Sequence, residues 1–155
     1  MTPAERRDRM IDDIVARTGL DEAVLDRLVR GFYARVREDA LLGPVFAARV
    51  ADWEPHLQRM AAFWSSVALM SGRYHGRPME KHLPLPVNRE HFARWLALFE
   101  ATAHEVCSPA GAAHVIERAH RIARSIEMAM EDASAADGPP RLATARTLAT
   151  ETAGS

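Results

Sequence analysis

Apolar residues recur every three or four positions along most of this chain, which is the period of an amphipathic helix. Three such faces are clearest: Leu25, Leu28, Val29, Phe32 and Val36; then Phe92, Trp95, Leu96, Phe99, Ala103 and Val106; and finally Val115, Ala119, Ile122, Ala123, Ile126 and Met130. No segment shows the two-residue alternation between turns that predicts a strand. The pattern therefore predicts an all-α fold.

Local signals predict where several of these helices begin and end. Thr2-Pro3-Ala4-Glu5 reads as a capping box with proline in the first turn, and Gly19 is a good signal for the end of that helix. Asp21 and Asn88 are placed to cap two later helices, and Ser108-Pro109 begins the last one. The first helix is expected either to dock on the domain or to be a partly mobile extension.

A long central helix is expected after Asp52, with Trp53 to Ser71 as its body and Gly72 as its stop. It carries two adjacent apolar stripes, which are Trp53, Leu57, Met60, Trp64 and Val67, and His56, Met60, Phe63 and Val67. A surface this wide predicts burial on two sides. His56 is the polar exception, and a lone histidine in such a stripe is more often a satisfied core or boundary residue than a ligand.

Length and composition limit the function classes. The 155 residues fit one main domain, expected over residues 21–132, with a helical extension over 1–20 and a disordered tail over 133–155. The net charge of -1 indicates neither nucleic acid nor a membrane surface as a partner. Cys107 is the only cysteine, which excludes an intramolecular disulfide and a Cys-x-x-Cys-His haem attachment. No signal peptide or membrane span is evident, so a cytoplasmic protein is expected.

A short turn between two prolines carries the most informative histidine. Pro78 can start a helix and Pro84 ends it, which leaves little more than one turn, too short to be stable alone. His82 lies at the end of that turn with an imidazole able to bind a metal. A bond from His82 to an iron would anchor the turn; alternatively, Leu83 and Leu85 tuck into a core and His82 is solvated.

A haem would need a flat apolar slot, one axial ligand, and polar groups facing its other side. His82 is the candidate axial ligand, and Tyr33, His56 and Trp95 are polar groups on otherwise apolar faces that could surround a bound diatomic ligand. The candidate slot residues are Phe46, Met60, Phe63, Leu85 and Phe92, and the candidate cations for the haem propionates are Arg59 and Lys81.

An ordered series of motifs resembles group III truncated haemoglobins over roughly residues 21 to 131. The matching motifs are Phe32-Tyr33, Asp39, Leu42-Gly43-Pro44-x-Phe46, Trp53-x-x-His56, Phe63-Trp64, Tyr74-x-Gly76-x-Pro78, Lys81-His82-Leu83 and His91-Phe92-x-x-Trp95-Leu96-x-Leu98-Phe99. The resemblance implies a truncated globin, a two-over-two helical sandwich around haem b, here with an extra N-terminal helix. It also implies the roles of individual residues: His82 as proximal ligand, Tyr33 and Trp95 as distal donors, His56 as distal gate, Phe46 packed on the haem edge, and Tyr74 among the cofactor contacts.

The function expected from this resemblance is reversible binding of oxygen, nitric oxide and carbon monoxide. A redox role is expected as well, such as nitric oxide dioxygenation or peroxidase-like chemistry with peroxide, and a reductase partner is left open. The alternative is a six-coordinate haem sensor or electron-transfer protein with His56 as second axial ligand. A third reading is a haem-free helical interaction module.

Overall fold

The computed structural model describes residues 1–74 and 87–137, with the side chains of the last helix described up to Asp132. Within these ranges the secondary structure is entirely helical. The helices are α1 (Pro3–Thr18), α2 (Glu22–Glu38), α3 (Gly43–Arg49), α4 (Trp53–Leu69), α6 (Arg89–Val106) and α7 (Pro109–Asp137). The prediction of an all-α fold is confirmed. No helix among the described residues is both long enough and apolar enough to cross a membrane.

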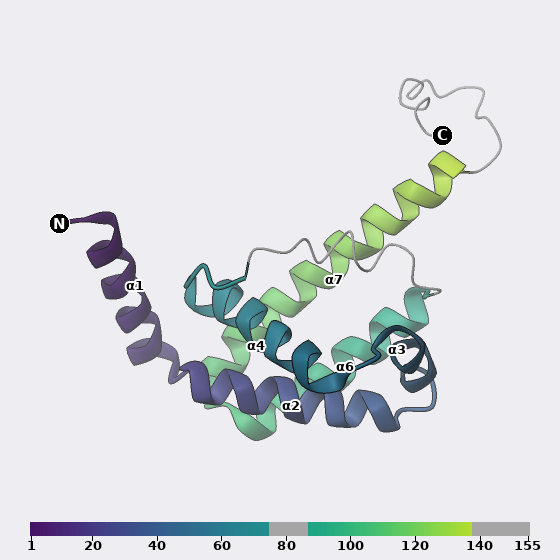
Figure 1. The fold of residues 1–155 in the computed structure, drawn as a ribbon, viewed down its shortest axis with the longest axis horizontal. Coiled ribbons are helices and arrows are strands. Elements are labelled where there is room, and N and C mark those ends of the chain that lie inside the picture. Colours follow the sequence, from purple (N-terminus) through teal and green to yellow (C-terminus); the bar gives the residue numbers. More distant parts are fainter. Residues whose placement is uncertain (75–86, 138–155) are drawn as a thin grey trace.

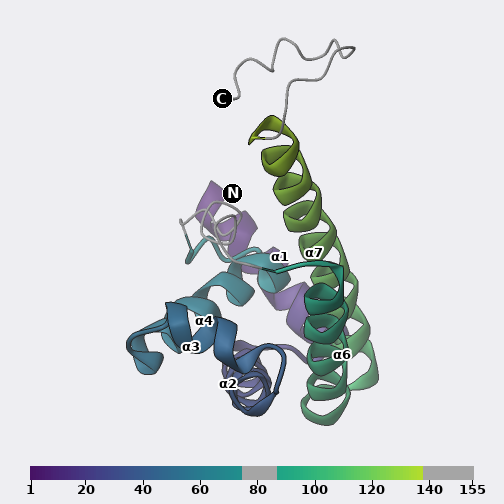
Figure 2. The same cartoon turned by 90° about the vertical axis from the view of Figure 1, so that its right-hand side faces the viewer.

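Four long helices form two layers. Helices α2 and α4 pack together as one pair, α6 and α7 pack side by side as the other, and α2 lies against α6 where the pairs meet (Figures 1 and 2). The short helix α3 packs on α2. This is the two-over-two sandwich that the resemblance to truncated haemoglobins implies, and it leaves the aromatic faces of α2, α4 and α6 turned toward a shared interior.

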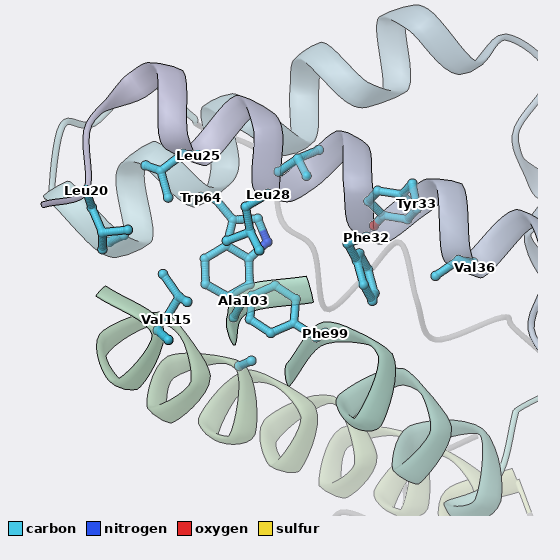
Figure 3. Packing of buried hydrophobic residues seen from close by; sticks show 14 of the residues in the cluster. Leu20, Leu25, Leu28, Phe32, Tyr33, Val36, Trp64, Phe99, Ala103 and Val115 are labelled. Atoms are coloured by element: carbon cyan, nitrogen blue, oxygen red, sulfur yellow. The ribbon is translucent and has the colours of Figure 1, made fainter. Parts of the chain in front are cut away.

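The core follows the predicted helical faces closely. The largest side chains with almost no exposure include Phe32 and Phe99 together with a set of leucines, and Figure 3 shows α2 contributing one side of this packing and α6 and α7 the other. Phe32 and Phe99 are 2% and 1% exposed, respectively, and their rings make an edge-to-face contact at a centroid distance of 5.4 Å. Such pairs add about 0.5–1.5 kcal/mol to the free energy gained from burial. The contact fixes α6 against α2.

Most helix starts are set by the predicted caps. In α1 the Thr2 hydroxyl accepts the Glu5 amide at 3.0 Å, while the Glu5 carboxylate accepts the Thr2 amide at 2.8 Å. The Asp21 carboxylate accepts the Val24 amide at 2.9 Å, and the Asn88 side chain accepts two amides at the start of α6. Each of these groups satisfies an amide that has no partner inside the helix.

The long helix α4 departs from the prediction at both ends. Asp52 occupies the cap position, but its side chain makes no capping hydrogen bond. The helix ends at Leu69 rather than at Ser71, and the left-handed residue that terminates it is Met70, with φ of 60°, ahead of Gly72. At the other end of the chain α7 runs to Asp137, past Ala133, where the sequence suggested that the tail begins.

Helix α1 is docked on the domain through its C-terminal half. Ile14 and Thr18 are buried, and the Ser108 hydroxyl donates to the Thr18 carbonyl at 2.8 Å, which joins the end of α1 to the start of α7. Gly19 follows with φ of 71°, the left-handed conformation that favours glycine. The first turns of α1 point away from the body (Figure 1), and all side chains from Met1 to Met10 are exposed.

Candidate haem cleft

One apolar cleft gathers side chains from both helical pairs. Its empty volume is about 710 Å³, counting the part that is open to solvent. The residues that line it come from α2, the α2–α3 turn, α3, α4, the position before the α6 cap, α6 and α7: Tyr33, Leu42, Phe46, Met60, Phe63, Trp64, Val87, His91, Phe92, Trp95, Ile122, Ala123 and Ile126. Apolar and aromatic surface dominates, with a few polar tips, as in most small-molecule sites.

Tyr33 supplies a buried phenol to this cleft. It projects from α2 beside Phe32 (Figure 3), and its ring lies 5.8 Å from Phe46 and 5.0 Å from His56 between centroids. Burial raises the pKa of the Tyr33 hydroxyl well above its usual range, because the charged phenolate would be poorly solvated there. The hydroxyl therefore stays protonated at neutral pH and is able to donate a hydrogen bond.

Trp95 supplies an indole from α6. Its ring is stacked on Phe99 at a centroid distance of 5.7 Å with only 10° between the planes, and it meets Phe32 edge to face at 5.4 Å. Phe99 stacks on Trp64 at 4.8 Å as well. The chain of ring contacts from Trp64 through Phe99 to Trp95 leaves the Trp95 ring little freedom to turn, and its N–H can only donate.

The turn between α2 and α3 is tied to α6 beside Trp95. One oxygen of Asp39 accepts the amides of Leu41 and Leu42 at 3.0 and 2.9 Å, and the other lies 3.3 Å from the Arg94 guanidinium. Asp39 is only 10% exposed in its side chain, whereas Arg94 is 50% exposed. This arrangement fixes the turn that carries Leu42, a cleft-lining residue, relative to Arg94 on α6.

His91 is a third polar group at the cleft. The Asn88 backbone amide donates to its Nδ1 at 3.1 Å, which completes the capping box of α6. The same Nδ1 lies 2.9 Å from the Asn88 side-chain oxygen, so both the backbone and the side chain of Asn88 contact this nitrogen. The start of α6 thus fixes the orientation of this imidazole while the ring lines the cleft.

Tyr74 provides the test of whether these residues fit a haem. Its ring meets that of Phe63 edge to face at 5.3 Å, and its hydroxyl is buried with no hydrogen-bond partner among the described residues. A buried hydroxyl without a partner costs about 1–3 kcal/mol. A haem carries acceptor groups on its edge and an apolar face, so the orphaned hydroxyl, the apolar walls and the donors Tyr33 and Trp95 together fit that group.

The structure brings together most of the residues that the sequence singled out. Lining the cleft are Tyr33, Phe46, Met60, Phe63, Phe92 and Trp95. His56 is partly buried behind them, against the rings of Tyr33 and Trp53, and is not itself a lining residue. Arg59 is exposed and does not line the cleft, and Tyr74 contacts the lining residue Phe63 without lining the cleft itself. Lys81, His82 and Leu85, and the short turn that carries them, lie outside the described residues.

Sequence reasoning missed several residues of the cleft. His91 was part of a matched motif without a role of its own, although it lies four positions before Trp95 and therefore on the same helical face. Ile122 and Ile126 were placed on the inward face of the last helix. Their approach to the cleft depends on how α7 lies over α6, which no local pattern reports.

Comparison with known proteins agrees with this geometry. Residues 14–130 match the family described as bacterial-like globin. Over 109 residues, 67% of this chain and 86% of the relative, the sequence is 33% identical to the group 3 truncated haemoglobin ctb of Campylobacter jejuni. It is 29% identical over 80 residues, 50% of this chain and 61% of the relative, to the group 2 truncated haemoglobin YjbI of Bacillus subtilis.

A solved structure is similar as well. The crystal structure of the group III truncated haemoglobin from Campylobacter jejuni superposes with a TM-score of 0.68 at 31% identity, over 72% of this chain and 91% of that one. The family match spans most of the chain and includes every helix that lines the cleft. The chain therefore belongs to the bacterial-like globin family, among the truncated haemoglobins, and membership of that family implies haem binding.

Proposed function

We propose that the protein holds haem b in this cleft and reversibly binds oxygen, nitric oxide and carbon monoxide there. The observation that supports this most directly is the convergence of Tyr33 and Trp95, from two different helices, on one apolar cleft. Bound haem would supply an iron that binds diatomic molecules and changes oxidation state. The polypeptide supplies the donors, the dry walls and the ligand to the iron.

Tyr33 and Trp95 would control how long oxygen stays bound. Both donate hydrogen bonds, and a donor facing a ligand with partial negative charge contributes about 1.5–3 kcal/mol. At about 1.4 kcal/mol per decade, one such bond slows oxygen release roughly 10- to 100-fold. Two donors would hold oxygen tightly, which suits chemistry on the bound molecule better than transport.

His82 is proposed as the residue that holds the iron. It lies outside the described residues, so the support comes from the sequence motif and from the described residues nearest to it on either side. Tyr74 packs on Phe63 at the cleft, and Val87 lines it. The segment that contains His82 is therefore preceded by a residue packed on a cleft-lining ring and followed by a residue that lines the cleft.

A redox role is part of the proposal. Oxygen held by two donors can combine with nitric oxide to give nitrate, leaving the protein oxidised by one electron, or the oxidised protein can react with peroxide in a peroxidase-like manner. Continued turnover to nitrate then requires one electron per cycle from a reductase. A cytoplasmic location would place the protein beside such a donor.

The six-coordinate alternative would place His56 on the iron opposite His82. In the structure the His56 ring contacts Tyr33 and Trp53, at 5.0 and 5.5 Å between centroids, and it stands outside the set of residues that line the cleft. This placement favours five-coordinate iron. The optical spectrum of the reduced, ligand-free protein separates the two, because six-coordinate haem gives sharp split bands and five-coordinate haem a single broad band.

Replacing His82 by alanine tests the proposal. We expect the His82→Ala protein to purify without haem and to stay unloaded when haemin is added. The ratio of Soret to protein absorbance after titration with haemin measures the loading. His104→Ala is the matched control, because His104 is exposed on α6 and lies away from the cleft-lining residues, so this variant should stay fully loaded. A fully loaded His82→Ala variant would show that another residue holds the iron, and a wild-type protein that never takes up haem would refute the function.

A further inference from the structure

The chain leaves α4 through a strained residue. Met70 adopts φ of 60° and ψ of 35°, and among the described residues it is the one non-glycine residue with positive φ. This conformation costs an L-residue about 1–2 kcal/mol. The Met70 side chain is 56% exposed and gains little from packing. Such a conformation persists where the surrounding contacts determine it.

Those contacts form a directed chain of hydrogen bonds behind the turn. The fully buried Ser65 hydroxyl lies 2.7 Å from Glu22 Oε2 and 2.6 Å from the Ser71 hydroxyl. A carboxylate only accepts, so Ser65 donates to Glu22, and its single proton is then used. Ser71 must therefore donate to Ser65, and the Ser71 oxygen in turn accepts the Arg73 amide at 3.4 Å.

The same carboxylate holds the other side of the turn. Glu22 Oε1 accepts from the Arg73 guanidinium, so one oxygen of Glu22 engages Ser65 within α4 and the other engages Arg73 after it. One residue later, the Tyr74 amide donates to the Ser66 hydroxyl at 2.8 Å. Glu22 is the first residue of α2, where the partial positive charge of the helix N-terminus favours a carboxylate. The network thus runs from the start of α2 to the backbone that presents Tyr74.

We propose that Glu22 is a positioning residue for Tyr74. Through Ser65, Ser71 and Arg73 it sets the turn after α4, and that turn decides where the Tyr74 ring stands against Phe63 at the cleft. The inference rests on the proposed function only in taking the cleft as a haem site. The placement of Tyr74 by Glu22 is a property of the polypeptide and can be measured whether or not haem is bound.

The composition of the chain offers a selective readout, because it contains only two tyrosines. Full-length protein labelled with 3-fluorotyrosine, reduced under carbon monoxide to avoid paramagnetic broadening, should give one ¹⁹F signal for Tyr33 and one for Tyr74, assigned with Tyr74→Phe. We expect Glu22→Ala to shift or broaden the Tyr74 signal and leave the Tyr33 signal in place. A general loss of stability would affect both.

Glu105→Ala is the matched control. Glu105 pairs with Arg35 at 2.8 Å and is 66% exposed in its side chain, against 51% for Glu22, but it does not contact the turn after α4. It should leave both signals unchanged. Glu22→Gln keeps an acceptor for Ser65 and loses the charge that holds Arg73, so its effect on the Tyr74 signal should be smaller than that of Glu22→Ala.

The haem dissociation rate completes the test. If a displaced Tyr74 loses one hydrogen bond to a haem propionate, which is an ionised acceptor, Glu22→Ala should release haem about tenfold faster or more. An unmoved Tyr74 signal in Glu22→Ala, or equal changes in both tyrosine signals, would overturn the positioning role. Failure of the wild-type protein to bind haem would overturn the proposed function alone, because the same two fluorine signals can then be compared between wild type and Glu22→Ala in the haem-free protein.

Discussion

The cleft wall on α2 and α6 and the turn after α4 are built in different ways. On the side of α2 and α6, aromatic rings meet one another directly, as in the edge-to-face contacts of Phe32 with Tyr33 and Trp95 at 4.8 and 5.4 Å. At the end of α4, the buried hydroxyl of Ser65 and the charges of Glu22 and Arg73 hold the chain by hydrogen bonds. The first side is dry, and the second is polar.

The difference shows how one small domain can hold two donors in fixed places and also set the position of a single residue at a turn. Close-packed rings resist change because any smaller side chain leaves a cavity, so they keep Tyr33 and Trp95 at fixed places. A hydrogen-bonded turn is directional but stabilises weakly where its charges are exposed. Mutations in the aromatic side should therefore alter global stability, whereas mutations at the turn should move one residue.

The largest expected effect is on the aromatic side. Phe99 is 1% exposed and lies between the rings of Trp64 and Trp95. Phe99→Ala should lower the free energy of unfolding by about 3–5 kcal/mol, because it removes a buried ring and leaves a cavity. Urea denaturation followed by tryptophan fluorescence and by circular dichroism measures this loss.

Glu22→Ala measures how much the turn after α4 contributes to the free energy of unfolding. Its ion pair with Arg73 is about half exposed on both partners, and the buried Ser65 hydroxyl keeps Ser71 as a partner, so the substitution should lower the free energy of unfolding by about 1–2 kcal/mol, less than Phe99→Ala. Met128→Ala serves as the surface control. Met128 lies on α7 and is 57% exposed, so its replacement should change the free energy of unfolding little. If Glu22→Ala destabilised the protein as much as Phe99→Ala, the turn would be part of the core and the distinction would fail.

An effect on ligand release, smaller than the loss of stability in Phe99→Ala, tests the donors of the aromatic side. Trp95→Phe keeps an aromatic ring to stack on Phe99 and removes the indole N–H. Under the proposed function, the oxygen dissociation rate should rise about tenfold or more, the loss of one charge-assisted hydrogen bond. Stopped-flow displacement of oxygen by carbon monoxide measures the rate.

Trp53→Phe is the control for that substitution. Trp53 contacts Tyr33 and His56 but does not line the cleft, and the Arg37 guanidinium covers its ring at 4.6 Å from the centroid. Its replacement should leave the oxygen dissociation rate unchanged. An unchanged rate in Trp95→Phe would remove Trp95 from the set of donors and leave Tyr33 as the sole candidate of the pair.

Local signals predicted the fold where the physical cause is local. The caps at Thr2, Asp21 and Asn88 are each satisfied within three residues, so the sequence shows both partners. The apolar faces of α2 and α6 also follow from helical periodicity. Tyr33 and Trp95 could be found because a polar group on such a face stands out.

The rest depends on residues that are far apart in the chain. The end of α4 was expected at Gly72, yet it falls at Met70, next to a turn bonded to Glu22, which lies 43 residues before Ser65. Ile122 and Ile126 reach the cleft only because α7 packs along α6. No helical periodicity reports such long-range choices.

The smallest expected effect comes from relieving the strain at Met70. Glycine adopts this left-handed conformation freely, and the exposed methionine side chain contributes little, so Met70→Gly should raise the free energy of unfolding by about 0.5–1 kcal/mol. Gly19 ends α1 in the same conformation, with φ of 71°, and Gly19→Ala should lower the free energy of unfolding by a similar amount. Urea denaturation of both variants makes the measurement. If Met70→Gly is stabilised and its Tyr74 fluorine signal does not move, the hydrogen bonds to Glu22 and Ser66 set the turn, and the left-handed residue does not. A displaced Tyr74 signal would show that Met70 itself is required to hold Tyr74 against Phe63.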